Sequence, residues 1–452
     1  MPASCRRPAE WVLAWIFAEV LGLDAVCSEH AGDGFEIRFQ GKVLAVAGDF
    51  FRLNMPVWLR ADSLVVEAAT DWLDVGDTLD ANLLSASIPV LWGRPGFVRT
   101  ERGDGHLYLD VFGSIFFMLS RYEEVIKAER DQYDRFPADA SLAVGRDFLH
   151  RPIVDEYIEI LWSAMLCLWP GLTRKPGAGK MWVTCDVDEP YERWIRNPWL
   201  LAQGVGGSLV RRRSLSGAVG RIRNAWHSRQ GKYHLDPHWT FDWYMGRLEE
   251  NGCQGAFYFI PTPGNTPYDC IYSLAEKRMQ ALLKSISDRG HEIGVHGSFK
   301  TFRDGALVAR ERRTLIDACD SAGAVADVRG NRQHYLRWDA RETADHLDQA
   351  GFAYDTSGGF PYNPGFRYGT ARSFPMWSWI KQQPLKLRQR PLIMMESAVI
   401  NSLGLGYTDE ALDAMKRIKK AALRYGDFTM LWHNSRFTEA GDSSLFTRIL
   451  AA

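Results

Sequence analysis

The stretch "WVTCDVDEP", residues 182–190, runs from apolar residues into two aspartates and ends at a proline. Its apolar run begins at Met181 and has the length and composition of a buried β-strand. Asp186 and Asp188 stand two positions apart at the end of that strand, so both side chains point to the same side. Two carboxylates at a strand end share a cation or divide the roles of base and metal ligand, unless they only form an Asp-x-Asp turn.

From this strand onward, apolar runs alternate with amphipathic helical runs. Strands are predicted at "MWVTCDV" (181–187), "GAFYFI" (255–260) and "HEIGVH" (291–296), and helices at 273–290 and 306–323. Such alternation predicts a parallel sheet or barrel with its chemistry at the carboxyl ends of the strands. His296 ends one of these strands, and His433 ends a later one in "DFTMLWHNS" (427–435). Several strand ends that each offer a carboxylate or an imidazole indicate a barrel active site.

Before residue 181 the predicted strands and helices do not alternate. Short strand-like runs ("FEIRF", "KVLAVAG", "SIPVLWG", "HLYLDV") are followed by helical runs over 111–130 and 151–169. The segment "PGLTRKPGAGK" (170–180) is rich in Gly, Pro and Lys and is typical of a boundary. We therefore predict an N-terminal accessory α/β domain over residues 1–175 and a barrel over residues 176–452.

The composition is that of a globular protein and argues against nucleic-acid binding, a disulfide framework and a membrane span. The chain has 452 residues, 46% of them hydrophobic and 24% charged, and a net charge of −1, which argues against nucleic acid as a partner. Seven scattered cysteines without a C-x-x-C pair favour reduced thiols over a disulfide framework. The apolar N-terminal run is interrupted by Glu10, Glu19 and Asp24, so we expect an amphipathic helix and not a signal peptide. No apolar run reaches membrane-spanning length, and a cytoplasmic location is expected.

The segment 193–235 contains no acidic residue and interleaves basic with aromatic and aliphatic side chains. Its basic residues are Arg193, Arg196, Arg211, Arg212, Arg213, Arg221, Arg223, Arg229 and Lys232. One interpretation is a solvated insertion between the first two barrel strands. The other is a basic, aromatic lip that touches anionic lipid or a phosphate-bearing substrate.

Four motifs of the sequence resemble those of a known protein family. "TCDVD" (184–188), "RGHEIGVH" (289–296), "NRQHY" (331–335) and "LWHNS" (431–435), in this order, resemble the motifs of the polysaccharide deacetylase family, also known as the NodB homology domain or carbohydrate esterase family 4. The resemblance covers about residues 178–437. Three further segments, 111–125, 135–144 and 354–370, resemble a subgroup that has an uncharacterised N-terminal domain and is associated with bacterial surface-polysaccharide synthesis.

The resemblance implies a distorted (β/α)7 barrel in which a metal ion activates water for attack on an N-acetyl carbonyl. Matched position by position, it implies Asp186 as general base, Asp188 and His296 as metal ligands, Arg332 as the arginine that holds the base, the amide of Tyr335 as oxyanion donor, His433 as general acid and, more loosely, Glu396 as the partner of that histidine. Together a cation, a carboxylate base and an imidazole acid form a coherent hydrolytic site.

One position departs from the family pattern. The family carries H-x-x-x-H, but the residue four positions after His296 is Lys300, whose ammonium cannot bind a cation and would repel it. His291 does not replace it, because it should face elsewhere on the strand. Three outcomes are open: His334 supplies the missing nitrogen, the metal binds with water in its place, or Lys300 replaces the charge of the metal.

We expect that the site still binds a divalent metal ion, foremost zinc, through Asp188 and His296, because a carboxylate pair without a cation would repel itself. Lys300 should turn outward after the Gly297-Ser298 pair, and the third ligand is then His334 or water.

The expected function is hydrolysis of an N-acyl group, foremost N-acetyl, from an amino sugar in cell-surface polysaccharide synthesis. The expected partners are an amino-sugar glycan or lipid-linked saccharide and an anionic membrane surface met through 193–235, so the protein would be cytoplasmic and peripheral to the inner membrane. Two alternatives are open: a degenerate carbohydrate-binding or scaffold subunit, and a deformylase or amidase that acts on another C–N bond.

Overall fold

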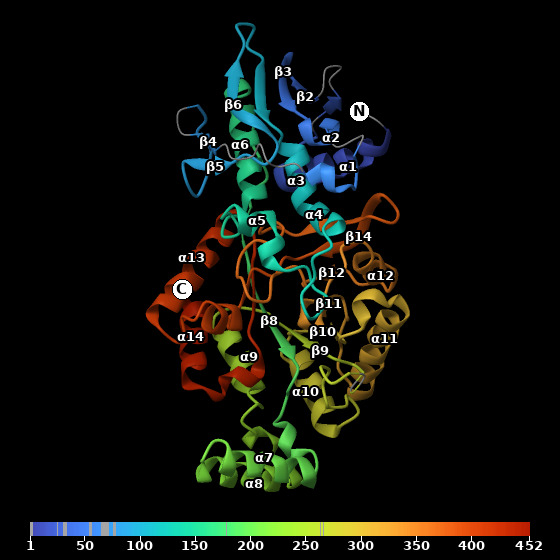
Figure 1. Ribbon diagram of the computed structural model, residues 1–452, viewed down its shortest axis with the longest axis vertical. Helices are drawn as coiled ribbons and strands as arrows, with labels where there is room; N and C mark the ends of the chain where they lie inside the picture. Colours follow the sequence, from blue (N-terminus) through green and yellow to red (C-terminus); the bar gives the residue numbers. More distant parts are fainter. Residues whose placement is uncertain are drawn as a thin grey trace.

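Figure 1 shows the computed structural model of the chain, which describes residues 3–24, 26–29, 34–53, 57–64, 72–75, 78–177, 179–262, 264 and 266–452. Three parts follow one another along the long axis. An N-terminal sheet with its helices lies at one end, a barrel lies in the middle, and a pair of helices projects at the other end.

A mixed sheet organises the N-terminal part, with the strand order β1-β2-β3-β7-β6. The bounds in that order are Val26–Glu29, Gly34–Phe39, Lys42–Ala47, Gly105–Leu109 and Gly93–Arg99, while β4 (Trp72–Asp74) and β5 (Ser87–Pro89) pair separately. The helices are α1 (Ala3–Ala14, continued by a π-helical turn over Trp15–Leu21), α2 (Asp49–Leu53), α3 (Val111–Leu119), α4 (Tyr122–Ile126), α5 (Leu142–Gly145) and α6 (Ile153–Leu168). Phe35 of β2 meets Phe112 of α3 with ring centroids 4.9 Å apart, so the sheet packs on a fully buried helix.

The helical run predicted over residues 111–130 is divided in the structure into α3 and α4, and residues 127–130 are not helical. Between α3 and α4 the chain turns at Arg121, which has a left-handed φ of 53° that a continuous helix does not allow. The turn directs the Arg121 guanidinium into the interior, where it pairs with Glu124 at 2.7 Å and Glu123 at 2.8 Å. A buried guanidinium must be paired, and the turn at Arg121 brings it to Glu123 and Glu124. This pairing outweighs the preference of residues 111–130 for one continuous helix.

The central sheet is formed by parallel strands, as the β/α rhythm predicts. The strands are β8 (Met181–Val187), β9 (Gly255–Phe259), β10 (Glu292–Gly297), β11 (Gly330–Gln333), β12 (Tyr354–Asp355), β14 (Gln383–Gln389), β15 (Met394–Met395) and β16 (Phe428–Leu431), with β13 (Phe374–Ser378) antiparallel to β14. Their order is β13-β14-β12-β11-β10-β9-β8-β16-β15, so sequence neighbours lie side by side and the first strand, β8, contacts the last, β16.

The sheet closes on itself through one bent stretch, residues 383–395. Its first part, β14, pairs with β12, and the Arg390 amide donates to the carbonyl of Asp355 at 2.8 Å. Its last part, β15, pairs with β16, and the Ile393 amide donates to Thr429 at 3.0 Å. Pro391, which has no amide hydrogen to donate, stands at the bend between these two pairings. The fold is therefore the predicted distorted (β/α)7 barrel, preceded by a smaller α/β part.

Helices cover the outside of the barrel (Figure 1). They are α9 (Phe241–Glu250), α10 (Lys277–Asp288), α11 (Gly305–Ala322), α12 (Thr343–Gln349), α13 (Asp409–Tyr425) and α14 (Ala440–Ala451). Side chains cap the longest two: Asp304 accepts from the Leu307 amide at 2.9 Å, and Thr408 accepts from Ala411 at 3.2 Å. Among the helices of the described ranges, none is both long enough and apolar enough to cross a membrane.

The N-terminal part docks against the antiparallel edge of the barrel. The indole of Trp11 in α1 donates to the Pro375 carbonyl at 3.1 Å, and its ring centroid lies 5.4 Å from that of Trp377 in β13. Below this contact the Arg367 guanidinium binds Glu124 through two bonds of 2.9 and 2.7 Å. Buried apolar residues of both parts form one continuous core, so the two parts share an interior.

The basic insertion folds as a helical hairpin, an outcome that the sequence analysis did not predict. Helix α7 (Pro198–Val210) begins after Asn197, whose side chain accepts from the Leu200 amide at 2.8 Å. Helix α8 (Leu215–Arg229) begins after Ser214, which accepts from the Gly217 amide at 3.0 Å. Both helices project away from the barrel (Figure 1).

Candidate active site

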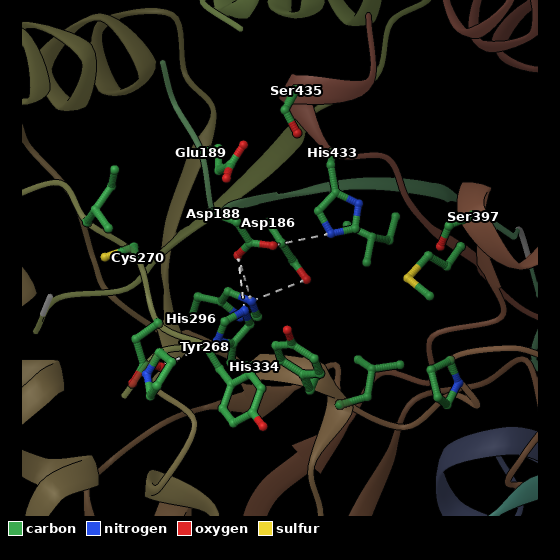
Figure 2. Close-up of a pocket in the computed structure, with 18 of the residues that line it drawn as sticks. Asp186, Asp188, Glu189, Tyr268, Cys270, His296, His334, Ser397, His433 and Ser435 are labelled. Carbon is green, nitrogen blue, oxygen red and sulfur yellow. Dashed lines mark hydrogen bonds and ion pairs between the residues drawn. The ribbon is translucent and has the colours of Figure 1, made fainter. Parts of the chain in front are cut away.

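The carboxyl ends of the barrel strands deliver the predicted site residues to one place. Asp186 is the penultimate residue of β8, and Asp188 is the first residue after that strand. His296 is the penultimate residue of β10. His334 comes directly after β11, and His433 comes two residues after β16. Figure 2 shows these five side chains pointing toward one another. The parallel order of the strands explains why residues so distant in sequence meet at one edge.

These residues line a cavity of ≈ 510 Å³. Its other walls come from the loops that follow the strands and from the N-terminal part, and include Arg135, Glu189, Arg193, Tyr268, Asp269, Tyr335, Tyr362 and Ser397. The volume is within the range of small-molecule sites, and the polar residues converge at its floor.

Three ligand atoms in this cavity are grouped as a metal site requires. Asp188, His296 and His334 offer one atom each, and these atoms lie within 4.8 Å of one another. The Asp188 Oδ1 atom is 3.3 Å from Nε2 of His296 and 3.6 Å from Nε2 of His334. Among the described residues, nothing donates a hydrogen bond to the buried Oδ1 atoms of Asp186 and Asp188. Their unused lone pairs fit a cation, and two imidazoles with one carboxylate are a donor set that zinc accepts.

The outer nitrogen of each candidate histidine ligand is held in place. Nδ1 of His296 lies 2.9 Å from the carbonyl of Arg332, an acceptor that leaves Nε2 free to bind a metal. Nδ1 of His334 lies 3.4 Å from Oδ1 of Asp269. Asp269 is itself fixed by the Phe299 amide at 2.7 Å and the Thr266 hydroxyl at 2.7 Å. Both rings are therefore oriented with Nε2 toward Asp188.

The charge of Asp188 also suits a ligand. Burial works against its ionisation, but His334 and His296 hold the pKa of Asp188 well below its usual range. Its carboxylate is thus ionised at neutral pH and available to a cation.

Lys300 does not enter this cluster, because its side chain is exposed. The Lys300 side chain thus faces outward as we expected, but Gly297 does not adopt a left-handed conformation. A Cβ at Gly297 would lie 2.8 Å from side-chain atoms of Gln333 and Thr301, which would have to shift. His291 is also remote: its Nδ1 accepts from the Gly255 amide at 3.0 Å, at the amino ends of β10 and β9, whereas the cluster lies at the carboxyl ends.

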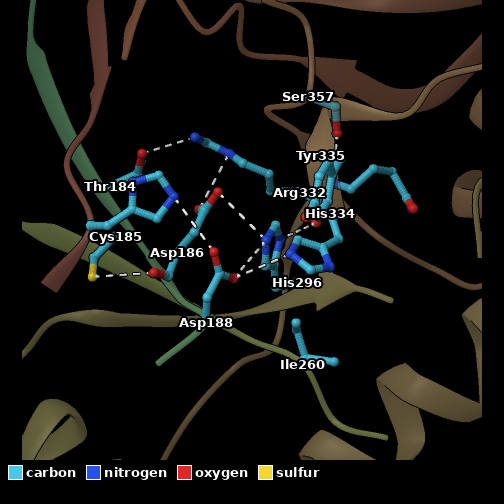
Figure 3. Close-up of polar contacts among 12 residues, drawn as sticks. Thr184, Cys185, Asp186, Asp188, Ile260, His296, Arg332, His334, Tyr335 and Ser357 are labelled. Carbon is cyan, nitrogen blue, oxygen red and sulfur yellow. Dashed lines mark hydrogen bonds and ion pairs between the residues drawn. The ribbon is translucent and has the colours of Figure 1, made fainter. Parts of the chain in front are cut away.

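Asp186 is held by Arg332, which is fully buried (Figure 3). Nε of Arg332 lies 3.8 Å from Oδ1 of Asp186. The guanidinium donates to Thr356 at 2.7 Å and to Thr184 at 2.8 Å, which fixes its plane. The fixed guanidinium holds Asp186 from one side, and Asp186 also lines the cavity.

His433 lies on the opposite side of the cavity from His334 (Figure 2). Its Nδ1 is 2.6 Å from Oε1 of the buried Glu396, and its Nε2 is 3.7 Å from Oδ2 of Asp188. Burial disfavours the charged ring, but the Glu396 carboxylate, followed by Asp188 and Asp186, raises the pKa of His433 to about 10. The imidazole is therefore a proton donor at neutral pH.

Tyr335 follows His334 and lines the cavity, and the two rings are in contact with centroids 4.7 Å apart. Its backbone is left-handed, with φ of 60°, and Leu336 after it has φ of 54°. Such a conformation costs free energy for residues other than glycine and is retained where the surroundings enforce it. The surrounding packing therefore enforces the left-handed turn at Tyr335, a residue that lines the cavity.

Two residues of the site were missed by the sequence analysis. Asp269, the partner of His334, lies in a loop after β9 without a recognisable motif. Arg135 belongs to the N-terminal part, yet it lines the cavity and donates to the Tyr335 carbonyl at 3.0 Å and to the Tyr362 hydroxyl at 3.0 Å. The signal for Arg135 was its position at the start of "RFPADASLAV", a segment that resembles the subgroup with an additional N-terminal domain.

Comparison with known proteins matches the two parts separately. The profile of a family of unknown function (DUF7033) matches residues 2–170. No protein with a curated description matches the chain. A protein assigned as a polysaccharide deacetylase from Mycobacterium smegmatis is similar in structure, with 16% identity and a TM-score of 0.38 over 62% of this chain and 85% of that chain.

Two further solved structures are similar at the same level. Puue allantoinase has 12% identity and a TM-score of 0.36 over 61% of this chain and 85% of its own. A protein assigned as a polysaccharide deacetylase from Pseudomonas aeruginosa has 11% identity and a TM-score of 0.35 over 62% of this chain and 88% of its own.

Proposed function

We propose that this protein removes an N-acyl group, foremost N-acetyl, from an amino sugar by metal-dependent hydrolysis during bacterial cell-surface polysaccharide synthesis. One observation carries the proposal: a metal-type triad, a carboxylate held by an arginine and a histidine held by a carboxylate line a single cavity. Amide hydrolysis needs an activated water, a stabilised oxyanion and a proton for the leaving amine. The four motifs that resemble the polysaccharide deacetylase family support the same reaction.

Asp188, His296 and His334 would hold the ion, and zinc is the first choice for two imidazoles and one carboxylate. A bound divalent ion lowers the pKa of water and polarises a carbonyl oxygen. The chain prepares this site by fixing both rings through Arg332 and Asp269.

The remaining residues would move the protons. Asp186, held beside Arg332, would take a proton from the attacking water. The amide of Tyr335 would donate to the oxygen that becomes negative. His433, charged at neutral pH because of Glu396, would return a proton to the nitrogen that leaves.

Aromatic side chains around the mouth of the cavity support a saccharide substrate. Tyr268 is 45% exposed and Tyr362 is 51% exposed, and both line the cavity. Their rings offer an apolar face with a hydroxyl at the tip, which suits a sugar that has both C–H faces and hydroxyl groups. Tyr268 is supported from behind by Phe299, with stacked rings 4.5 Å apart.

We also propose a cytoplasmic setting. The unpaired thiols in the described part of the chain are Cys167, Cys185, Cys253, Cys270 and Cys319, while the side chains of Cys5 and Cys27 lie outside the described residues. Free thiols in this number are typical of a reducing compartment. Fractionation of the bacterial cell into cytoplasm, periplasm and membranes tests the setting directly.

The test is release of acetate from N-acetylated amino-sugar oligosaccharides by protein stripped of metal and then reloaded with zinc. We expect turnover only after reloading, and a loss of about 100-fold or more in Asp186→Asn and in His433→Ala. Asp288→Asn, which changes an exposed carboxylate, serves as the matched control. Zinc binding without hydrolysis of any N-acyl substrate would favour a carbohydrate-binding subunit, and hydrolysis confined to formyl groups would identify a deformylase.

A further inference from the structure

The helical hairpin α7–α8 exposes its bulky apolar side chains to solvent. Leu215, Val219, Ile222 and Trp226 recur at helical spacing along α8 and are 72%, 56%, 53% and 55% exposed. Of the nineteen large apolar side chains that are exposed in the described part of the chain, eight lie within residues 193–235. A continuous apolar stripe on a projecting element marks an interaction surface and not an ordinary protein face.

Small residues make the internal contacts of the same hairpin. Gly204 and Ser208 are buried on α7, and Ala218 and Ala225 are buried on α8. A Cβ at Gly204 would lie 2.7 Å from the indole of Trp194, so the helices approach closely around that ring. The hairpin therefore holds together without its large apolar residues, whose exposure needs another explanation.

The charge around the stripe has one sign. No acidic residue occurs in 193–235, and Arg211, Arg212 and Arg213 are exposed together in the turn between the helices. Within the described residues, no cation of this segment forms an ion pair with an acidic side chain of the chain. The hairpin is thus a local, uncompensated positive charge on a chain whose net charge is −1.

We propose that the hairpin binds the surface of an anionic lipid bilayer. The aliphatic and tryptophan side chains of the stripe enter the boundary between headgroups and acyl chains, and the flanking arginines meet the lipid phosphates. A nucleic acid would leave that row in water, and an apolar face flanked by arginines is typical of helices that lie at a membrane surface. The apolar stripe and the flanking arginines together therefore favour an anionic membrane as the binding partner.

The position of the hairpin connects this surface to the cavity. Arg193, at the base of the hairpin, lines the cavity. Asn224 of α8 ties the base to Glu192 at 2.9 Å and to Asp236 at 2.8 Å, so the hairpin is fixed relative to the cavity mouth. Membrane binding would therefore present the cavity to a saccharide carried on a lipid, and this last step rests on the proposed function.

The experiment is co-sedimentation of the full chain with vesicles of phosphatidylcholine, with or without phosphatidylglycerol. We expect binding only with the anionic lipid, and weaker binding as salt rises from about 0.1 M to about 1 M, where the Debye length falls from about 10 Å to about 3 Å. Both L215S/I222S and R211Q/R212Q/R213Q should reduce the affinity roughly tenfold or more. The matched controls V325S/I380S and K416Q/R417Q/K420Q change exposed side chains elsewhere and should bind like the parent.

Unchanged binding in both hairpin variants, or equal binding to neutral vesicles, overturns the proposal. So does a parent that never binds vesicles but forms a dimer that L215S/I222S converts to a monomer, since the stripe would then be a contact between copies. Circular dichroism and acetate release from a short water-soluble oligosaccharide should be the same in parent and variants. Because sedimentation needs no turnover, a failure of the proposed function leaves this result interpretable.

Discussion

Lys300 occupies the position of the second histidine in an H-x-x-x-H pair. A different histidine, His334 after strand β11, directs its ring toward Asp188 instead. His296 on β10 and His334 after β11 direct Nε2 toward Oδ1 of Asp188, at 3.3 and 3.6 Å. Adjacent parallel strands bring their ends together as closely as one helical turn brings two side chains. The third ligand can therefore come from a neighbouring strand, and Lys300 is free to face solvent.

This arrangement predicts the order of metal affinities in variants of the cluster. His296→Ala should abolish zinc binding, and His334→Ala should weaken it strongly, because each removes one of three protein ligands. Asp269→Asn should weaken it by about 10- to 100-fold through the orientation of His334. Lys300→Ala should bind zinc like the parent. Titration calorimetry with zinc measures all four.

If Lys300→Ala lost activity in a protein that never contained metal, the lysine would have replaced the cation and the ligand assignment would be wrong. Lys284→Ala, which removes another exposed ammonium, controls for the loss of a charge.

At the scale of elements, the connection between α4 and α5 completes the cavity from the N-terminal part. Arg135 donates to the Tyr335 carbonyl and the Tyr362 hydroxyl and pairs with Asp131 at 2.7 Å. Tyr133 of the same connection contacts the ring of Tyr335, with centroids 4.9 Å apart. The N-terminal part therefore braces the left-handed turn that carries the proposed oxyanion donor.

Arg135→Ala should lower kcat by about 10- to 100-fold with little change in zinc content, because a displaced Tyr335 turn misplaces the oxyanion donor. Arg135→Lys should restore part of the rate, since an ammonium makes one of these contacts but not the planar set. Arg130→Ala removes a neighbouring cation that does not line the cavity and should act like the parent. A parental kcat in correctly folded Arg135→Ala would show that this contact has no positioning role.

The α3–α4 break supplies a second contact between the two parts, and this contact depends on pH. Burial opposes the ionisation of Glu124, but Arg367 and Arg121 lower its pKa from 4.5 to about 2. A pKa that is lower in the folded state stabilises the fold fully above the unfolded value, and the contribution disappears as pH falls from about 4.5 toward 2.

Glu124→Gln should therefore lower the free energy of unfolding by about 3 kcal/mol at pH 7, because it removes the negative charge that pairs with two buried guanidinium groups. The difference from the parent should shrink as the pH approaches 2, where the parent is protonated as well. Denaturant unfolding at several pH values measures it, with the exposed Glu101→Gln as control. A difference that is constant with pH would contradict the assignment of the shift to Glu124.

For the whole molecule, one continuous core crosses from the N-terminal part into the barrel. Trp377 of β13 is 3% exposed because Trp11 and Phe116 cover it, and the Trp379 indole donates to the Ser120 carbonyl at 2.9 Å. Separation of the two parts would expose this aromatic surface to water. The boundary near residue 175 remains a prediction about sequence organisation, whereas the packing describes one interior.

A fragment with residues 176–452 should therefore aggregate when it is produced alone and should be rescued by co-production of residues 1–175. The reason is the loss of apolar burial along β13, which is worth about 25 cal/mol per Å² of apolar surface. Size-exclusion chromatography of the fragment, with and without its complement, gives the answer. A monomeric fragment with parental acetate release would show that the barrel is independent.

The sequence by itself indicated a parallel sheet or barrel and the residues at its strand ends, while the choice of a barrel came from the resemblance to a known family. Strands β8, β9 and β10 were predictable because buried parallel strands are short apolar runs between helical runs, a local property of the chain. The candidates Asp186, Asp188, His296 and His433 followed from the same rule, since each ends such a run. Tertiary structure decided what local patterns cannot encode: the closing strand 383–395 pairs on two sides, and its partners are distant in sequence. It also decided the break at Arg121 and the approach of Asp269 and Arg135, because buried charges are satisfied by whichever partners the whole fold brings within reach.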